Sequence, residues 1–140
     1  MNLTIEKAQP NDIDEVEQLY NDVCDHLADK DYNPGFRKGY YPTRNEALYF
    51  HNTGTLYVAR LDGKMVGSIA LTHNANAETD EELQYNTPEH EDILYIHEFV
   101  VNPDYLRKGI GTQILEFADQ VASQEGNKCI RLYVYEKVLI

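Results

Sequence analysis

The chain has 140 residues, the usual length of a single domain, and we expect one domain over residues 1–140. Its 24 acidic and 12 basic side chains give a net charge of −12, which argues against binding to the phosphate backbone of a nucleic acid. No apolar run approaches the roughly 20 residues of a membrane span, and the first residues do not resemble a secretion signal, so we expect a cytoplasmic protein without a membrane partner. Two cysteines are too few for a disulfide framework, which fits the same compartment.

The first two expected elements are a strand and a helix. Alternating apolar residues predict a strand at 3–8, and apolar residues spaced by three and four predict a helix with Asn11 as its N-cap. Cys24 lies next to the apolar stripe of this helix and is expected to be a core thiol. The residues expected on the buried face are Ile13, Val16, Leu19, Val23 and Leu27.

The middle of the chain contains a loop, a helix, a hairpin and a polar insertion. The loop at 33–42 is rich in turn formers and aromatic residues, and a second helix is predicted over 43–54. Alternation then predicts strands at 56–59 and 65–71, joined by a tight turn. The insertion at 74–92 is acidic and contains no lysine or arginine. It is either a solvated loop or a lid for a cationic substrate, and the sequence leaves both open.

The most strand-like segment lies at 93–101 and is mostly apolar, with two adjacent polar residues, His97 and Glu98. A further helix is predicted from Gly109, and a last strand at 129–135. The chain shows no internal repeat and no linker. These elements therefore predict a single α/β unit.

The segment from Arg107 to Thr112, between a strand and a helix, has the features of an anion-binding turn. A helix N-terminus offers unpaired N–H groups and partial positive charge, and glycines there let an anion approach the backbone. Arg107 and Lys108 add positive charge in an acidic chain. A Walker loop is absent, and Ile114 replaces the third glycine of a dinucleotide fingerprint. The alternative is a tight turn that merely needs glycine.

The run Val101-Asn102-Pro103-Asp104-Tyr105, followed by Arg107-Lys108-Gly109-Ile110-Gly111, resembles the acyl-CoA-binding motif of the GNAT N-acetyltransferases. The expected elements follow the order of that family from residue 3 onward, and the aromatic loop is similar to a loop of some small bacterial members. The resemblance implies a mixed α/β (α+β) sheet with the GNAT-like acyl-CoA N-acyltransferase fold, truncated at its C-terminus.

The resemblance also implies where acetyl-CoA, the cosubstrate, would bind. Its pantetheine arm would pair with the backbone of Phe99, Val100 and Val101. The residues whose backbone N–H groups would hold the pyrophosphate are Arg107, Lys108, Gly109, Ile110, Gly111 and Thr112.

The chain departs from the family pattern at two places. Leu106 stands where the family usually has Gln or Arg, and Arg107, the next residue, is expected to supply the positive charge instead. Val138 stands where an Asn is expected, and the sequence stops before the segment that contains the tyrosine general acid of the family. Either Tyr133 or Tyr135 replaces that acid, or the thiolate departs without one; both tyrosines are also explained by packing.

The implied reaction is direct attack of a primary amine on the thioester. An alkylammonium group is protonated at pH 7, so a base is expected, and His97 and Glu98 are the candidates. Strand alternation places them on opposite faces unless a bulge intervenes, and this strand is bulged in the family. The alternatives are a core histidine and a glutamate in a solvent-exposed or salt-bridge role.

The acceptor is expected to be a cationic small-molecule or peptide amine, bordered by the acidic insertion and the aromatic residues Phe36, Tyr40 and Tyr41. No metal is expected, because the histidines and cysteines lack ligand spacing. The apolar tail at 138–140 predicts a homodimer joined through the edge of the last strand. Two other functions remain open: a non-catalytic acyl-CoA-binding or regulatory module, and a structural fragment without a ligand.

Overall fold

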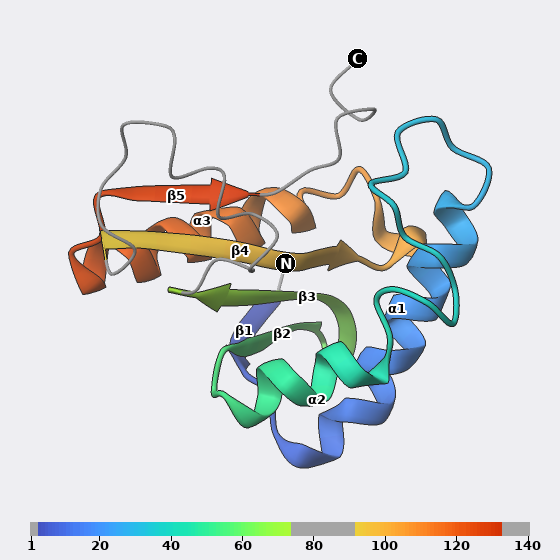
Figure 1. The fold of residues 1–140 in the computed structure, drawn as a ribbon, viewed down its shortest axis with the longest axis horizontal. Coiled ribbons are helices and arrows are strands. Elements are labelled where there is room, and N and C mark those ends of the chain that lie inside the picture. Colours follow the sequence, from blue (N-terminus) through green and yellow to red (C-terminus); the bar gives the residue numbers. More distant parts are fainter. Residues whose placement is uncertain (1–2, 74–91, 133–140) are drawn as a thin grey trace.

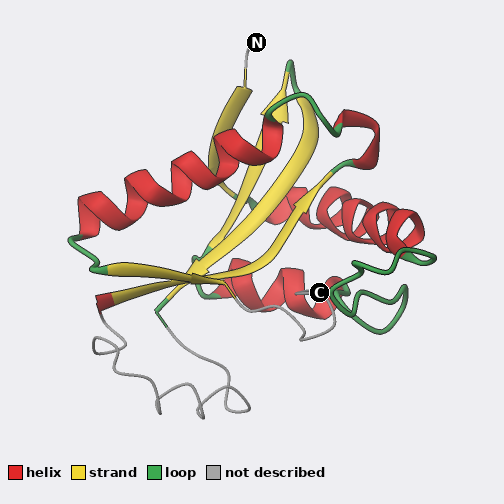
Figure 2. Ribbon diagram, turned by 90° about the horizontal axis from the view of Figure 1, so that it is seen from above, coloured by secondary structure: helices red, strands yellow, loops and turns green. Residues whose placement is uncertain are grey.

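The computed structural model describes residues 3–73 and 92–132, which form a curved mixed sheet with helices on both faces (Figure 1; Figure 2). The strands are arranged in chain order, and neighbours are antiparallel except for the last, parallel pair. This mixed α/β sheet confirms the predicted fold class. The strands are β1 (Leu3–Lys7), β2 (Leu56–Leu61), β3 (Lys64–Thr72), β4 (Ile93–Val101) and β5 (Cys129–Leu132).

Helices α1 (Ile13–Leu27) and α2 (Arg44–Asn52) cover one face of the sheet, and α3 (Ile110–Glu125) covers the other (Figure 1). Two short 3-10 helices, η1 (Pro10–Asp12) and η4 (Pro103–Tyr105), precede α1 and α3. The apolar stripes of α1 and α2 form one core cluster with the sheet, and the stripe of α3 forms a second on the opposite face. The expected order of strands and helices is confirmed over the described residues.

The start of α1 differs from the sequence prediction. Asn11 is not the N-cap, because residues 10–12 form η1 and Asp12 precedes the first α-helical residue. The Asp12 carboxylate accepts a hydrogen bond from the backbone N–H of Gln9 (2.7 Å) and pairs with Arg60 of β2 (2.7 Å). These two contacts favour helix initiation one residue later than predicted. The predicted apolar face of α1 is buried except for Leu27, which is half-buried, and Cys24 is a core thiol as expected.

The other two helices have well-defined starts. Thr43 caps α2, and its backbone N–H donates to Glu46 Oε1 (2.6 Å), which completes a capping box. Gly109 precedes α3 with φ +80°, a left-handed conformation that glycine adopts without strain. Gly126 ends the same helix with φ +75°.

A β-bulge in β4 changes which side chains face α1 and α2. Ser68 pairs with Val100 and Ala70 with His97, so two residues of β4, Glu98 and Phe99, oppose the single residue between them on β3. Glu98 has φ +42°, which is unusual for a residue with a side chain. The bulge turns the Glu98 side chain to the same face as that of His97, which simple alternation excludes.

Strand β5 pairs with only the first part of β4. The register joins residues 93–96 to residues 129–132, and no described residue of β5 pairs with residues 98–101 on that side. Backbone N–H and C=O groups along this part of β4 can pair with an extended ligand.

Several predictions fall outside the described residues. They concern the acidic insertion at 74–91, the general-acid candidates Tyr133 and Tyr135, and the tail at 138–140 that was expected to form a dimer edge. Within 3–73 and 92–132, no helix is both long enough and apolar enough to cross a membrane.

Candidate active site

Glu98 lies at the centre of the candidate site, on the bulge of β4. Its side chain is buried, with only 6% of the residue surface exposed. The hydroxyl of Tyr41 donates a hydrogen bond to Glu98 Oε1. Burial disfavours the charged carboxylate and raises the pKa of Glu98 to about 7. A carboxyl group with this pKa exchanges protons at neutral pH, which is the property that a general base requires.

The loop between α1 and α2 holds Tyr41 in place. Asn33 organises this loop: its Nδ2 donates to the carbonyl oxygens of Leu27 (3.1 Å) and Phe36 (2.9 Å), and its Oδ1 accepts from the N–H of Phe36 (2.7 Å). The backbone of Arg37 pairs with that of Tyr41 through hydrogen bonds of 2.7 and 2.9 Å. Hydrogen bonds within the loop backbone therefore hold Tyr41 in position, in addition to the contacts that its ring makes.

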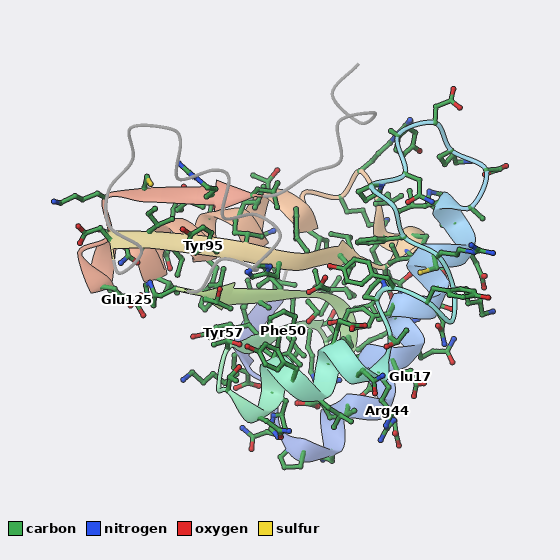
Figure 3. All side chains as sticks on the ribbon, in the orientation of Figure 1. Glu17, Arg44, Phe50, Tyr57, Tyr95 and Glu125 are labelled. Carbon is green, nitrogen blue, oxygen red and sulfur yellow. The ribbon has the colours of Figure 1, made fainter. Side chains whose placement is uncertain are left out.

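His97, the other base candidate, faces the same side of the sheet. It is 8% exposed, its Nε2 lies 3.1 Å from Thr72 Oγ1, and its ring stacks on Phe50 at 5.5 Å between centroids. Figure 3 shows Phe50 between α2 and the strands of the sheet. Together with Phe50 and Thr72, His97 lines a cavity of about 320 Å³. These contacts fit both a packed core histidine and a group that a ligand in the cavity can reach.

The predicted anion-binding turn lies at the start of α3 and is open to solvent. Arg107 and Lys108 are exposed, and Arg107 has φ +63°. The first hydrogen bond of the helix joins the N–H of Gln113 to the carbonyl of Gly109 (3.1 Å). The N–H groups of residues 110–112 precede this bond and are available to an anion.

The two glycines of the turn serve different purposes. Gly109 adopts a positive φ, and a Cβ there would meet no atom within 4 Å. A Cβ on Gly111 would lie 3.5 Å from the Phe99 ring and 3.7 Å from Val101, so it would point at the sheet and not at an anion. Both distances are ordinary van der Waals contacts, so packing of α3 on β4 does not require glycine at 111, and the opening of the backbone to phosphate at Gly111 stays a prediction.

The remaining predicted cofactor residues offer mainly backbone. Phe99 and Val101 pack toward α3, and Val100 packs toward α1. The side chain of Ile110 is buried, whereas that of Thr112 is exposed. A strand edge that no described residue of β5 pairs with, followed by a cluster of N–H groups and two cations, fits a long ligand with an amide-containing arm and a diphosphate, which is the chemistry of CoA.

The three predicted acceptor residues occupy different environments. Tyr41 contacts Glu98, and its ring meets that of Phe36 edge to face at 6.0 Å. Phe36 is partly buried against the core formed by α1. Tyr40 is 70% exposed and lies under the guanidinium of Arg37, 4.4 Å from the ring centroid. The structure thus brings Tyr41 and Glu98 together, while Tyr40 lies at the surface of the loop.

The comparisons with known proteins identify the family of the chain. The model of the acetyltransferase (GNAT) family matches residues 20–138, which is most of the chain. The chain belongs to the GNAT acetyltransferase family. The predicted family resemblance is therefore confirmed.

The chain is similar to relatives and solved structures that are named acetyltransferases. An uncharacterised N-acetyltransferase from Methanocaldococcus jannaschii is 27% identical over 137 residues, with 94% of this chain covered. The chain spans only 53% of the length of that relative. A GNAT family acetyltransferase from Streptococcus agalactiae has a similar structure (TM-score 0.74, 20% identity, 98% of this chain and 78% of that one). The PaiA N-acetyltransferase from Thermoplasma acidophilum, in complex with coenzyme A, also has a similar structure (TM-score 0.66, 18% identity, 97% of this chain and 81% of that one).

Sequence reasoning missed three residues of this GNAT site. Phe50 and Thr72 contact His97, and Tyr20 of α1 is fully buried, where burial and, after it, the charge of Glu98 raise the pKa of its hydroxyl. Tyr20 could have been found from the sequence, because a tyrosine next to the apolar stripe of a helix is expected to place its hydroxyl near a polar group in the core. Phe50 and Thr72 could not, because their positions depend on how α2 and β3 pack.

Metal binding has no support in the described part of the GNAT domain. Within residues 3–73 and 92–132, no three His, Cys, Asp or Glu side chains gather closely enough to hold an ion. The expectation of a metal-free site stays a prediction for the whole chain.

Proposed function

We propose that this GNAT domain transfers the acetyl group of acetyl-CoA to a primary amine by direct attack, with Glu98 as the general base. The observation that carries the proposal is the buried Glu98 carboxyl, which the bulge of β4 turns toward α1 and the aromatic loop. An alkylammonium group must lose a proton before it can attack, and a base with a pKa of about 7 accepts it at neutral pH. When bound, acetyl-CoA supplies an activated acyl group.

The proposed cosubstrate site combines the open turn and the part of β4 that lies beyond its described pairing with β5. Backbone N–H groups of residues 107–112, with Arg107 and Lys108, would hold the pyrophosphate. The backbone of residues 99–101 would pair with the pantetheine arm. The similarity to a structure that contains coenzyme A supports this assignment.

The proposed acceptor is a cationic amine, on a small molecule or a peptide. Two positive side chains near the aromatic loop are paired with carboxylates: Lys38 with Asp25 (3.1 Å), and Arg44 with Glu17 of α1 (2.9 Å; Figure 3). A third, Arg37, lies over the exposed Tyr40 ring. The Glu98 carboxylate and the Tyr41 ring beside it favour an ammonium group.

His97 is the second candidate base in this proposal. Its stack on Phe50 and its contact with Thr72 hold the ring at the wall of the cavity. His97→Ala and Glu98→Gln, measured side by side, separate the two roles, because only loss of the base lowers turnover by about 10²–10⁴.

The experiment that tests the function is release of free thiol from acetyl-CoA with a panel of amines. The panel contains a polyamine, an aminoglycoside, a lysine peptide and a peptide with a free N-terminus. We expect at least one acceptor to release thiol with wild-type protein, and Glu98→Gln to abolish most of this release. Glu116→Gln, an exposed position on α3, is the matched control and retains activity.

Two results would contradict the proposal. Calorimetric binding of acetyl-CoA without thiol release by any amine favours the non-catalytic acyl-CoA-binding module. If acetyl-CoA does not bind and no thiol is released, the proposed cosubstrate is wrong as well. The predicted homodimer is a separate proposal, and light scattering that finds only a monomer at high concentration contradicts it.

A further inference from the structure

The cavity of about 320 Å³ that His97 lines is situated at the end of the sheet where β3 stops. Its lining comes from both faces of the sheet and includes Phe50 of α2, Tyr57 of β2 and Glu125 of α3 (Figure 3). The turn before α3 follows the other end of β4, where Val101 pairs with Gly67. The cavity is therefore separate from the proposed pyrophosphate site, and its volume is in the range of pockets that bind small molecules.

The charges of this cavity differ from those of the chain as a whole, which has a net charge of −12. Among its described lining residues, Lys7 is the only lysine or arginine, and Glu125 is the only aspartate or glutamate. Oε1 of Glu125 lies 2.9 Å from Nε2 of His73, so this carboxylate already has a partner. Lys7 is exposed and forms no ion pair with any carboxylate that the structure describes. Its single positive charge matches the single negative charge of a ligand carboxylate.

The cavity also has apolar lining. The Leu94 side chain is buried in its wall, and the Phe50 ring stacks on His97. Such a wall favours the methylene groups of a ligand. His97 lines the same cavity and precedes Glu98, whose side chain the bulge turns to the same face of the sheet. An amine beside His97 is therefore directed toward the proposed base.

The strand register indicates the length of ligand that this cavity accommodates. Lys7 is opposite Tyr57 on β2, which is opposite Ile69 on β3. The next residue of β3, Ala70, is opposite His97. Three strand spacings thus separate Lys7 from His97, about 14 Å along the sheet, and the two side chains cover part of this distance. A ligand that contacts both residues needs several bonds between its amine and its carboxylate, as in an ω-amino acid and unlike an α-amino acid.

We propose that this cavity binds the acceptor, and that the acceptor is a small ω-amino acid whose carboxylate pairs with Lys7 and whose amine lies beside His97. Lys7 is then a specificity residue, because it distinguishes an amine with a distant carboxylate from the same amine without one. Delivery of the amine to Glu98 rests on the proposed function, whereas binding in the cavity does not.

The test compares 6-aminohexanoate with 6-aminohexanamide, which have the same chain and amine but differ in charge at the far end. Each is titrated into the protein without acetyl-CoA, and NMR follows the ring resonances of His97, assigned by their loss in His97→Ala. We expect wild type to bind the carboxylate about fivefold more tightly than the amide, and Lys7→Met to bind the two equally.

Lys64→Met is the matched control and keeps the preference for the carboxylate. Lys64 is also an exposed lysine of the sheet without an ion pair to a described carboxylate, but it lies over the Tyr105 ring and outside the cavity lining.

Three results would overturn the proposal: equal affinity of wild type for the two ligands, a preference that survives in Lys7→Met, or His97 resonances that shift with neither ligand. A preference that depends on Lys7, without thiol release from acetyl-CoA, keeps the cavity site and removes the proposed function. In an active enzyme, Lys7→Met raises KM for 6-aminohexanoate about fivefold and leaves kcat unchanged. The same variant leaves both constants for 6-aminohexanamide unchanged.

Discussion

The hydroxyl of Tyr41 donates a hydrogen bond to the carboxylate of Glu98, although 57 residues separate them in the sequence. This bond connects the loop between α1 and α2 to the bulge of β4. Burial raises the pKa of Glu98, whereas a hydrogen-bond donor to the charged carboxylate lowers it. The core and the Tyr41 hydroxyl of the loop therefore shift this pKa in opposite directions. The conformation of the loop therefore contributes to how easily Glu98 accepts a proton.

The first prediction concerns the pH dependence of turnover. Glu98 must be ionised to act as a base, so kcat/KM rises with pH up to about 7 and then levels off. Initial rates over pH 5–9 in wild type and Glu98→Gln test this expectation, and the variant loses the acid limb together with most of its activity. If the limb persists in Glu98→Gln and disappears in His97→Ala, His97 is the titrating base.

The second prediction uses two tyrosines of the same loop. Tyr41→Phe removes the donor to Glu98, so the pKa of Glu98 and the acid limb of kcat/KM rise by about one pH unit. Tyr40→Phe is the matched control: Tyr40 is an exposed phenol beside Arg37, and its loss leaves the limb unchanged. An equal shift in both variants would attribute the effect to the loop as a whole and not to the hydrogen bond.

The third prediction concerns stability. The pKa of Glu98 rises from 4.5 to about 7 on folding, so the folded state binds this proton more tightly than the unfolded chain. The contribution is complete below pH 4.5 and is lost as pH rises through about 7, at a cost on the order of 3 kcal/mol. Urea unfolding at several pH values measures it. The free energy of unfolding of wild type falls over this range relative to Glu98→Gln, and parallel curves for the two proteins would contradict the raised pKa.

Hydrophobic patterning was sufficient to predict the order of elements, because each helix buries a single stripe, β1 alternates, and the central strands β3 and β4 are mostly apolar runs buried along their length. The turn before α3 was also predictable, since glycines, cations and a strand–helix junction coincide there. The position of Glu98 relative to His97 was not. It depends on the extra residue in β4, and a bulge is defined by its pairing with β3, which is not encoded in either strand alone.

Two other features depended on tertiary packing. Asp12 replaces Asn11 at the start of α1 because its carboxylate also pairs with Arg60, a residue 48 positions away. Tyr41 was expected to contact an acceptor, but nothing in the local sequence indicated that its hydroxyl reaches Glu98.

The fourth prediction tests the proposed pyrophosphate site. Arg107 and Lys108 are exposed at the start of α3, so replacing both with alanine leaves the fold intact and weakens acetyl-CoA binding by about tenfold or more at low salt. Lys128→Ala, an exposed lysine beyond the other end of the same helix, is the control and binds as wild type. Titration calorimetry at two salt concentrations measures both. Equal affinity of the double variant and wild type would place the diphosphate elsewhere.

The last prediction compares two glycines that contact the same core. A Cβ at Gly67 of β3 would lie 2.6 Å from the Ile114 side chain of α3 and 3.0 Å from the carbonyl oxygen of Val100, whereas a Cβ at Gly111 would meet only ordinary contacts. Gly67→Ala therefore forces α3 away from the sheet and lowers the free energy of unfolding by about 1–3 kcal/mol. Gly111→Ala changes it by less than about 1 kcal/mol, since the helix tolerates alanine there. Urea unfolding of both variants distinguishes the two, and equal stability would show that α3 shifts without cost. A displaced α3 also moves the N–H groups of its first turn relative to β4, so Gly67→Ala is expected to weaken acetyl-CoA binding without changing any residue of the proposed cosubstrate site.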